Sequence, residues 1–573
     1  MKCCKFLKLL FVTIIFIEVI PPTCARVVNT TSGPVQGLLN HWHNLDYYSY
    51  LGIPYAESPV GKLRFMPPVP KKSWKRILDA TQEGPVCPQG HGPQEPYKIE
   101  EMSEDCLFLN IHIPANVQKN KLSVFVFVHG GTFRLLSGNS DVLYGPQLFL
   151  EQGLIFVTMN FRLGALGFLS LDIEEASGNA GLKDVILALK WINNNIERFG
   201  GDRNKITIGG HSSGASAVHY LLLTQQASDL FQRAILISGS AVSHRFIARH
   251  AKDNTLILAK ELGLMTDDVH ELLKKLQEIK VFDLIDAELN LTKYDDVVLR
   301  PFSMFVPTIE INSLHAVITS DPIKLLNLGL VQNIPILVGF NYREGIYGIP
   351  KIMQNKDKLK KLKENMEYSI PSDIEYPLGS KISKDLAKSI SQYYFNSDLS
   401  NFTLNNIVDL ISDSQYIYSI DSWIKKYKKV NGSNSVYYYM FNFDGDLNWS
   451  KINYNIDFPG TSHADELGYI FITKKTKDML NKIDCNSHLV KNIMTTLFSN
   501  FIKFGKPTPQ NLASNYKWPE YGKNGTFLII NENPTEGTLS PPLLARLKFW
   551  YDVYETYYNY VENGGKLEAK NIP

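Results

Sequence analysis

Residues 205–223 have the sequence Lys205-Ile-Thr-Ile-Gly-Gly-His-Ser-Ser-Gly-Ala-Ser-Ala-Val-His-Tyr-Leu-Leu-Leu223. Residues 205–208 are rich in β-branched side chains and predict a short buried strand, whereas residues 215–223 turn from small to apolar and predict a helix. Between them, residues 210–214 form a G-x-S-x-G pattern on a strand-to-helix turn. Such a turn raises the serine hydroxyl above a sheet edge, and it needs small residues two positions before and after the serine. This context favours Ser212 as a nucleophile over a chance glycine-rich turn.

Further apolar runs predict the sheet that holds this turn. Residues 124–128, Val-Phe-Val-Phe-Val, are apolar at every position, as in a strand buried on both faces. Similar runs occupy residues 154–159, 234–237 and 334–338, and residues 181–198 repeat apolar side chains at helical spacing. Strands that alternate with helices indicate an α/β fold with a mostly parallel central sheet flanked by helices.

The second half of the chain predicts helices that extend beyond this sheet. Residues 250–330 and 350–420 are charged, have helical periodicity and contain few strand-like runs, so we expect helical excursions over the active-site edge of the sheet. Residues 436–441 and 527–530 predict late strands, and residues 541–560 predict a C-terminal helix. Internal repeats and low-complexity linkers are not evident in the sequence, which favours a single catalytic domain over residues 26–573.

Composition and charge exclude several classes of partner. The 573 residues are 44% hydrophobic and 20% charged, which is ordinary for a globular protein with a large core. Basic and acidic side chains are equal in number after residue 25, and a basic run is not present. The sequence therefore predicts no binding of nucleic acid or of an anionic membrane surface, and it leaves the oligomeric state open.

The N-terminus has the pattern of a secretory signal peptide. Three lysines lie within the first eight residues, residues 9–17 form a mostly apolar run, and Thr23-Cys-Ala25 provides small residues around a cleavage site. A membrane anchor needs about 20 apolar residues, and Glu18 ends the run well before that length. We therefore expect residues 1–25 to be removed and the remaining chain to be secreted, without a membrane anchor.

Six cysteines are present, of which three lie in the first 25 residues. Cys87 and Cys106 are the obvious pair, and closing their loop would stabilise the fold by roughly 3 kcal/mol in the chain-entropy model. Cys485 is left over and is predicted to be a buried free thiol. If cleavage occurred before Cys24, a Cys24–Cys485 disulfide would be the competing assignment.

The secretory route makes N-glycosylation a further expectation. Six N-x-S/T sequons follow residue 25, and each is an acceptor only if it lies on the surface. Their asparagines are Asn29, Asn290, Asn401, Asn431, Asn448 and Asn524.

A serine nucleophile needs a base, and the base needs an acid that orients it. Glu344 follows the predicted strand 334–338, and His463 lies in a short polar segment further on, so the chain order is Ser, acid, His. This is the order that α/β-hydrolases use. Residues 129–133, His-Gly-Gly-Thr-Phe, follow the predicted strand 124–128, which is where esterases carry the glycine loop of the oxyanion hole.

With these motifs in place, the chain resembles the type-B carboxylesterases, a cholinesterase-like family of α/β-hydrolases, and within it the insect carboxylesterases. The resemblance extends from about residue 27 to residue 554, and the motifs together are highly specific. Besides the serine turn they are found at residues 52–56, 103–110, 160–168, 178–184, 195–202 and 238–240.

The resemblance implies a two-step acyl transfer to water from a small-molecule ester, with no metal or cofactor. Ser212 would attack the ester carbonyl, and His463 would move the proton while Glu344 orients its imidazole. The N–H groups of Gly131, Thr132 and Ser213 would form the oxyanion hole. Ser240 would support the Glu–His pair, and Cys87–Cys106 would be the N-terminal disulfide that the family shares.

Departures from the family pattern bear on rate and substrate. Thr132 stands where a third glycine or alanine is usual, and its branched Cβ restricts the backbone beside Ser212. Residues 88–105 contain no Trp, which disfavours acetylcholine, because cholinesterases hold its ammonium on a Trp in this loop. His211 replaces the Gln typical of juvenile hormone esterases.

These features favour a general esterase, or one that degrades odorants or pheromones, acting on apolar aliphatic or xenobiotic esters. Three alternatives stay open. One is a juvenile hormone esterase, the second is a slow enzyme that mainly sequesters esters, and the third is a binding protein that works through its surface.

Overall fold

The structure of the protein is a computed structural model. It describes residues 25–91, 96–116, 120–140, 142–295, 304–354, 356–397, 402–430, 435–510, 516–522, 524–559, 561–562 and 566–567. The predicted signal peptide, apart from residue 25, therefore lies outside the described residues.

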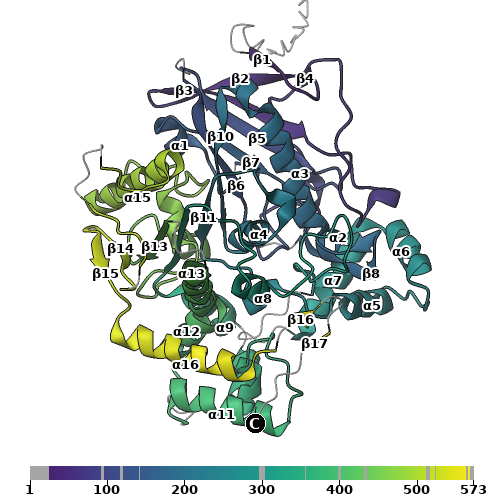
Figure 1. The fold of residues 1–573 in the computed structure, drawn as a ribbon, viewed down its shortest axis with the longest axis vertical. Coiled ribbons are helices and arrows are strands. Elements are labelled where there is room, and N and C mark those ends of the chain that lie inside the picture. The colour runs from purple at the N-terminus through teal and green to yellow at the C-terminus, as the bar shows by residue number, and fades with distance from the viewer. Residues whose placement is uncertain are drawn as a thin grey trace, which may run out of the picture.

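A single 13-stranded sheet forms the centre of the molecule (Figure 1). Its strands follow the order β1-β2-β3-β5-β7-β6-β10-β11-β12-β13-β14-β15, and β4 pairs with β2. Strands β7, β6, β10, β11, β12, β13 and β14 are mutually parallel, whereas β1, β2, β3, β5 and β15 join antiparallel at the two ends. The bounds are β1 Ala25–Asn29, β2 Pro34–Trp42, β3 Leu45–Pro54, β4 Leu78–Asp79, β5 Phe108–Pro114, β6 Leu122–Val128, β7 Ile155–Met159, β10 Gly201–His211, β11 Arg233–Ile237, β12 Ile336–Asn341, β13 Val436–Phe441, β14 Phe527–Ile530 and β15 Thr535–Gly537.

Helices cover both faces of this sheet and extend beyond it (Figure 1). Their bounds are α1 Gln147–Glu151, α2 Gly164–Phe168, α3 Ala180–Asn195, α4 Ser213–Leu222, α5 Ala251–Glu261, α6 Val269–Glu278, α7 Val281–Asp295, α8 Pro322–Asn327, α9 Ile349–Gln354, α10 Lys356–Glu364, α11 Lys381–Phe395, α12 Leu404–Ser412, α13 Tyr418–Val430, α14 Trp449–Tyr454, α15 Cys485–Phe504 and α16 Pro541–Tyr557. Two short separate ribbons pair β8 Ser170–Ile173 with β9 Ala176–Ser177, and β16 Val561–Glu562 with β17 Lys566–Leu567.

The alternation of side chains along β6 explains why the sheet needs two layers of helices. Val124, Val126 and Val128 join the core that contains buried residues of α3 and α4. Phe125 and Phe127 point to the other core, which contains residues of α1 and α15. Figure 1 shows α3 and α15 on opposite sides of the strands. A strand with both faces buried is apolar at every position. Burial of both faces of β6 therefore explains the continuous apolar run at residues 124–128.

The prediction of a mostly parallel sheet flanked by helices is confirmed. Strands β13 and β14 have the bounds that the sequence predicts, and β10 is longer than predicted because it already begins at Gly201. The two charged regions contain helices α5 to α8 and α9 to α13, as expected from their periodicity.

The parallel strands bring the candidate residues to one edge. Residues His211, Ile237 and Gly339 pair across neighbouring strands β10, β11 and β12. The segments that leave these strands therefore begin side by side, at the carboxyl edge where open α/β sheets place their sites.

Candidate active site

Ser212 occupies the turn between β10 and α4 in a strained backbone conformation. Its φ is 56° and its ψ is −123°, a region that side chains rarely adopt. A Cβ on Gly210 would lie 2.4 Å from the carbonyl carbon of Gly214, and one on Gly214 would lie 2.2 Å from the carbonyl oxygen of Val128. The small residues around Ser212 are therefore a steric requirement of the turn, as the sequence predicts.

The three predicted catalytic residues meet although they come from distant parts of the chain. The Nε2 of His463 lies 3.0 Å from the Oγ of Ser212, and its Nδ1 lies 2.6 Å from the Oε2 of Glu344. Glu344 begins the 3₁₀ helix η7 (Glu344–Gly348) just after β12, and His463 precedes the 3₁₀ helix η11 (Asp465–Tyr469). This geometry allows the imidazole to accept the serine proton while the carboxylate fixes its orientation.

Burial sets the protonation of this group. Ser212, Glu344 and His463 are 3%, 0% and 8% exposed. Burial, together with the positive charge of Arg245, lowers the pKa of His463 well below its ordinary value, so the imidazole is neutral and can act as a base near pH 7. Burial raises the pKa of Glu344, and hydrogen bonds from Ser238 and Asn341 oppose this rise by stabilising the carboxylate.

The serine that supports Glu344 is Ser238, and the prediction for Ser240 is wrong. The hydroxyl of Ser238 donates to the Oε1 of Glu344 at 2.6 Å, and the backbone N–H of Asn341 donates to the same oxygen at 2.7 Å. The Oγ of Ser240 lies 3.3 Å from the Nδ1 of His219 and accepts from the N–H of Val242 instead. The sequence Ser-Gly-Ser identifies the segment but not which hydroxyl faces the acid.

We expect the Ser238→Ala variant to have a kcat/KM for p-nitrophenyl butyrate about tenfold lower than the wild type. The change removes a hydrogen bond to a buried carboxylate, an interaction that is stronger than one between neutral groups. The matched Ser240→Ala variant should keep kcat/KM within about threefold of the wild type, because the hydroxyl of Ser240 contacts neither Glu344 nor His463. Steady-state kinetics on both purified variants checks this, and a larger loss in Ser240→Ala would contradict the assignment.

A second buried carboxyl group lies next to Glu344. Glu466 is 0% exposed, and its Oε1 and Oε2 accept from the Oγ of Ser238 at 3.2 Å and the Nδ2 of Asn341 at 2.5 Å. Burial raises the pKa of Glu466 above its ordinary value, and the neighbouring carboxyl of Glu344 adds to the rise. Ser238 and Asn341 therefore bridge two acids, of which the sequence analysis identified only Glu344.

The predicted oxyanion loop lies beside the serine. A Cβ on Gly130 would lie 3.3 Å from the Cβ of Ser212. Gly131 and Thr132 both have positive φ, 101° and 57°, and Thr132 donates through its Oγ1 to the Gly131 carbonyl at 2.7 Å. Within the described part of the chain, the N–H groups of Gly131 and Thr132 donate to no carbonyl. They are available to an anion at this point.

Aromatic rings surround the imidazole of His463. The rings of Tyr416, His211 and Tyr347 have their centroids 4.5, 4.6 and 5.5 Å from that of His463. Tyr416 lies in η10 (Asp413–Ile417), a single π-helical turn between α12 and α13. Turns of this kind occur frequently at functional sites, but they leave no clear pattern in the sequence.

The cysteine predictions are confirmed in part. Cys87 and Cys106 form a disulfide with a Cα–Cα distance of 5.0 Å. Cys485 is a free thiol, as expected, but it is exposed and not buried, because it is the first residue of α15 and the buried face of that helix begins at Ser487. Cys24, its alternative partner, lies outside the described residues.

The predicted glycosylation sites differ in accessibility. Asn29, Asn290 and Asn524 are exposed. Asn448 is 1% exposed and donates through its Nδ2 to Asp465 at 3.0 Å, so this sequon does not meet the surface condition in the folded chain. Asn401 and Asn431 lie outside the described residues.

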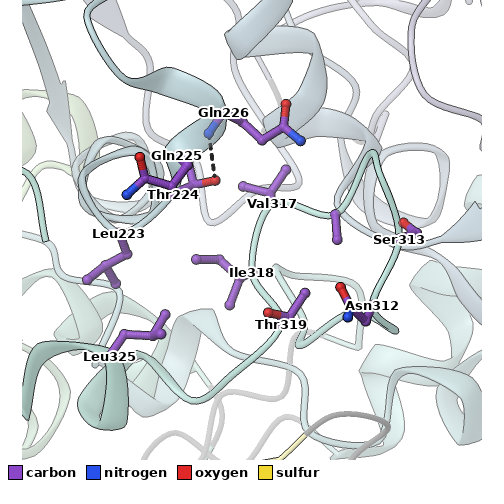
Figure 2. A pocket seen from close by; sticks show the side chains of 11 residues that line it. Leu223, Thr224, Gln225, Gln226, Asn312, Ser313, Val317, Ile318, Thr319 and Leu325 are labelled. Atoms are coloured by element: carbon purple, nitrogen blue, oxygen red, sulfur yellow. Dashed lines mark hydrogen bonds between the residues drawn. The ribbon is translucent and has the colours of Figure 1, made fainter. Parts of the chain in front are cut away.

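A separate cavity of about 450 Å³ lies at the opposite end of α4 from Ser212. Figure 2 shows the side chains that line it. The ten residues of α4 separate the two places by about 15 Å along the helix. The cavity is lined by Leu223, Thr224, Gln225, Gln226, Asn312, Ser313, Ala316, Val317, Ile318, Thr319 and Leu325. Since none of these side chains is a base or an activated nucleophile, the chemistry belongs to the group around Ser212.

The described residues contain neither a cluster of metal ligands nor a membrane-spanning helix. Groups of three or more His, Cys, Asp or Glu side chains that could hold a metal ion are absent from this part of the chain. Within the same residues, no helix has the length and apolar composition needed to cross a membrane.

Comparisons with known proteins agree with this geometry. The model of the family described as "Carboxylesterase family" matches residues 25–550. The chain is 32% identical to juvenile hormone esterase of Heliothis virescens over 86% of this chain and 88% of that protein. It is 31% identical to venom carboxylesterase-6 of Apis mellifera over 87% of this chain and 88% of that protein. The crystal structure of juvenile hormone esterase from Manduca sexta, with OTFP covalently attached, matches 93% of this chain and 100% of that chain, at 31% identity and a TM-score of 0.84.

Proposed function

Because this chain belongs to the carboxylesterase family and is a carboxylic ester hydrolase, we propose that it acts through an acyl-enzyme on Ser212. The single observation that supports this most strongly is the continuous hydrogen-bonded path from Ser212 through His463 to Glu344. In this proposal Ser212 is the nucleophile, His463 is the general base and acid, and Glu344 orients the imidazole.

The reaction has two halves. His463 takes the proton of Ser212 while the Oγ of Ser212 attacks the ester carbonyl. His463 then gives that proton to the leaving alcohol. In the second half His463 activates a water molecule, which releases the acid from Ser212. The N–H groups of Gly131, Thr132 and Ser213 would stabilise the negative charge on the carbonyl oxygen in both tetrahedral intermediates.

The proposed substrates are small-molecule esters with apolar aliphatic groups, such as odorants, pheromones or xenobiotic esters. The rings of Tyr416, Tyr347 and His211 around His463 support this class, because they offer apolar surface next to the reacting groups. Relatives named juvenile hormone esterase and venom carboxylesterase-6 are similar to this chain to almost the same degree, so the similarity does not select juvenile hormone.

The conformation of Thr132 favours a second candidate function, the sequestration of esters by a slow enzyme. A branched residue at a φ of 57° is a genuine outlier. If the N–H of Thr132 is poorly placed for the second tetrahedral intermediate, the ester would acylate Ser212 once and the acyl group would leave Ser212 slowly.

The proposal extends to processing and location. Residues 1–25 would be a cleaved signal peptide, and residues 26–573 would form one secreted catalytic domain. The Cys87–Cys106 disulfide supports an oxidising compartment. The exposed positions Asn29, Asn290 and Asn524 are the sequons that we propose for glycosylation.

Turnover of p-nitrophenyl acetate, butyrate and hexanoate by the secreted protein tests the proposed function. We expect repeated turnover, with a chain-length preference that reflects the apolar surroundings of His463. A single stoichiometric burst of p-nitrophenol would establish sequestration instead. No release above that of the Ser212→Ala protein, from a well-folded sample, would contradict both functions.

A further inference from the structure

The buried arginines of the described chain differ in how their charge is compensated. Four arginines are less than a tenth exposed. A buried charge is costly unless a group of opposite charge accompanies it. Three of the four have such a partner: Arg64 pairs with Glu104 at 2.6 Å, Arg162 with Asp184 at 2.6 Å and Arg249 with Asp321 at 3.5 Å. The fourth, Arg245, is 8% exposed and takes part in no ion pair with the described residues.

Arg245 lies beside the rings that surround His463. It belongs to the short 3₁₀ helix η6 (His244–Phe246), which follows β11. Its Nη1 donates to the hydroxyl of Tyr416, and the centre of its guanidinium lies 4.9 Å from the ring centroid of Tyr416 and 5.7 Å from that of Tyr347. Both rings contact the imidazole of His463, so one layer of aromatic rings separates this cation from the reacting groups.

Most of the hydrogen-bonding capacity of Arg245 is unused. A guanidinium carries five N–H donors, and the bond to Tyr416 is the one that Arg245 makes to the described residues. Its other nitrogens are not sealed from solvent, in contrast to the Nε of Arg249, which is buried without a partner. Arg245 therefore has N–H donors left for a further acceptor.

The nearby carboxyl groups do not take up these donors. The oxygens of Glu344 accept from His463, Ser238 and Asn341, and those of Glu466 accept from Ser238 and Asn341. Arg245 acts on Glu344 only through space, where its charge favours the ionised carboxyl. Because a buried charge without a partner of opposite charge is costly, the presence of an arginine at this position needs another explanation.

We propose that Arg245 binds a carboxylate carried by the substrate, so that the preferred substrates are esters with a second, ionised acid group. This inference rests on the proposed function and narrows its substrate class. The carboxylate would accept two parallel hydrogen bonds from the planar guanidinium, which is the geometry that arginine offers to acids. An aliphatic chain between the ester and the acid would pack on the rings of Tyr416 and Tyr347.

The test compares esters that differ only in charge. One pair places the acid on the acyl side, monoethyl adipate beside ethyl adipamate, in which an amide replaces the carboxylate. The other pair places it on the alcohol side, 4-acetoxybutanoate beside 4-acetoxybutanamide. For the secreted wild type we expect kcat/KM to be about tenfold or more higher for the carboxylate of at least one pair, as for a hydrogen-bonded charged group.

Variants of Arg245 show whether this residue causes the preference. In Arg245→Met the ratio of kcat/KM for the carboxylate ester to kcat/KM for the amide ester should fall to one or below. Arg245→Lys keeps the charge but not the planar guanidinium, so it should retain part of the wild-type preference for the carboxylate. The ratio is taken within each protein, so a general change in activity cancels. Circular dichroism and p-nitrophenyl butyrate turnover confirm that each variant is folded and reactive.

Two results would overturn the inference while leaving the esterase function intact. The first is a wild type that turns over p-nitrophenyl esters but prefers the amide, or shows no preference, in both pairs. The second is a carboxylate preference that Arg245→Met retains in full. Failure of the proposed function is a different result, namely no turnover of the p-nitrophenyl esters by the wild type.

Discussion

Replacing Ser212 with alanine is expected to lower kcat/KM for p-nitrophenyl butyrate by about 10⁴-fold or more. The change removes the nucleophile, and only binding and the oxyanion donors would then accelerate attack by water. The fold should be unaffected, because the Ser212 hydroxyl contacts His463 at the edge of the sheet and the strained backbone accepts alanine as readily as serine. Steady-state rates on highly purified protein, beside circular dichroism, check both parts of this expectation.

A serine in α4, the helix that follows Ser212, provides the control. Ser216 is fully buried, and its hydroxyl donates to the backbone carbonyls of Ser240 and Ser212 and not to the Oγ of Ser212 or to His463. The Ser216→Ala variant should therefore keep kcat/KM within about threefold of the wild type. If Ser212→Ala retained more than about a hundredth of the activity, the assignment of the nucleophile would be contradicted.

Replacing Glu344 with glutamine is expected to lower kcat by about 10³-fold to 10⁴-fold with little change in KM. An amide can donate a proton to the Nδ1 of His463, and this leaves Nε2 protonated and unable to accept the proton of Ser212. The lost negative charge also stabilised the imidazolium that forms in the transition state. Steady-state kinetics over several substrate concentrations separates kcat from KM.

Glu466 is the matched control for this variant, because it is the second buried acid and accepts hydrogen bonds from the same two residues as Glu344, Ser238 and Asn341. It makes no hydrogen bond to His463 among the described residues. We expect Glu466→Gln to cost less than about tenfold in kcat. An equal loss in the two variants would show that the pair of acids acts as one unit, against the role assigned to Glu344 alone.

Much of the fold could be predicted because the central strands are apolar on both faces. The runs at β6, β13 and β14 contain little else than apolar side chains, so their positions follow from burial alone. The antiparallel strands near the N-terminus, such as β3, mix buried with partly exposed residues, so no continuous apolar run marks them in the sequence. The start of β10 at Gly201 also escaped prediction, because its first residues are partly exposed.

The triad could be predicted because its residues lie in loops directly after strands of a parallel sheet, which brings them together. What escaped prediction depends on contacts between distant segments. The choice of Ser238 over Ser240 is made by the direction in which the chain leaves β11. The contact of Arg245 with Tyr416 joins η6 to a π-helical turn about 170 residues later in the chain. No local sequence pattern predicts such a turn or this contact.

The most direct test of the account is to find the acyl group on the protein. The wild type is mixed with p-nitrophenyl butyrate, quenched in acid within its first turnover, and digested for mass spectrometry of its peptides. We predict one butyryl group per molecule, on the peptide that contains Ser212, and its loss as turnover continues. A butyryl group on any other residue, or turnover that leaves Ser212 unmodified at every quench time, would contradict the central claim.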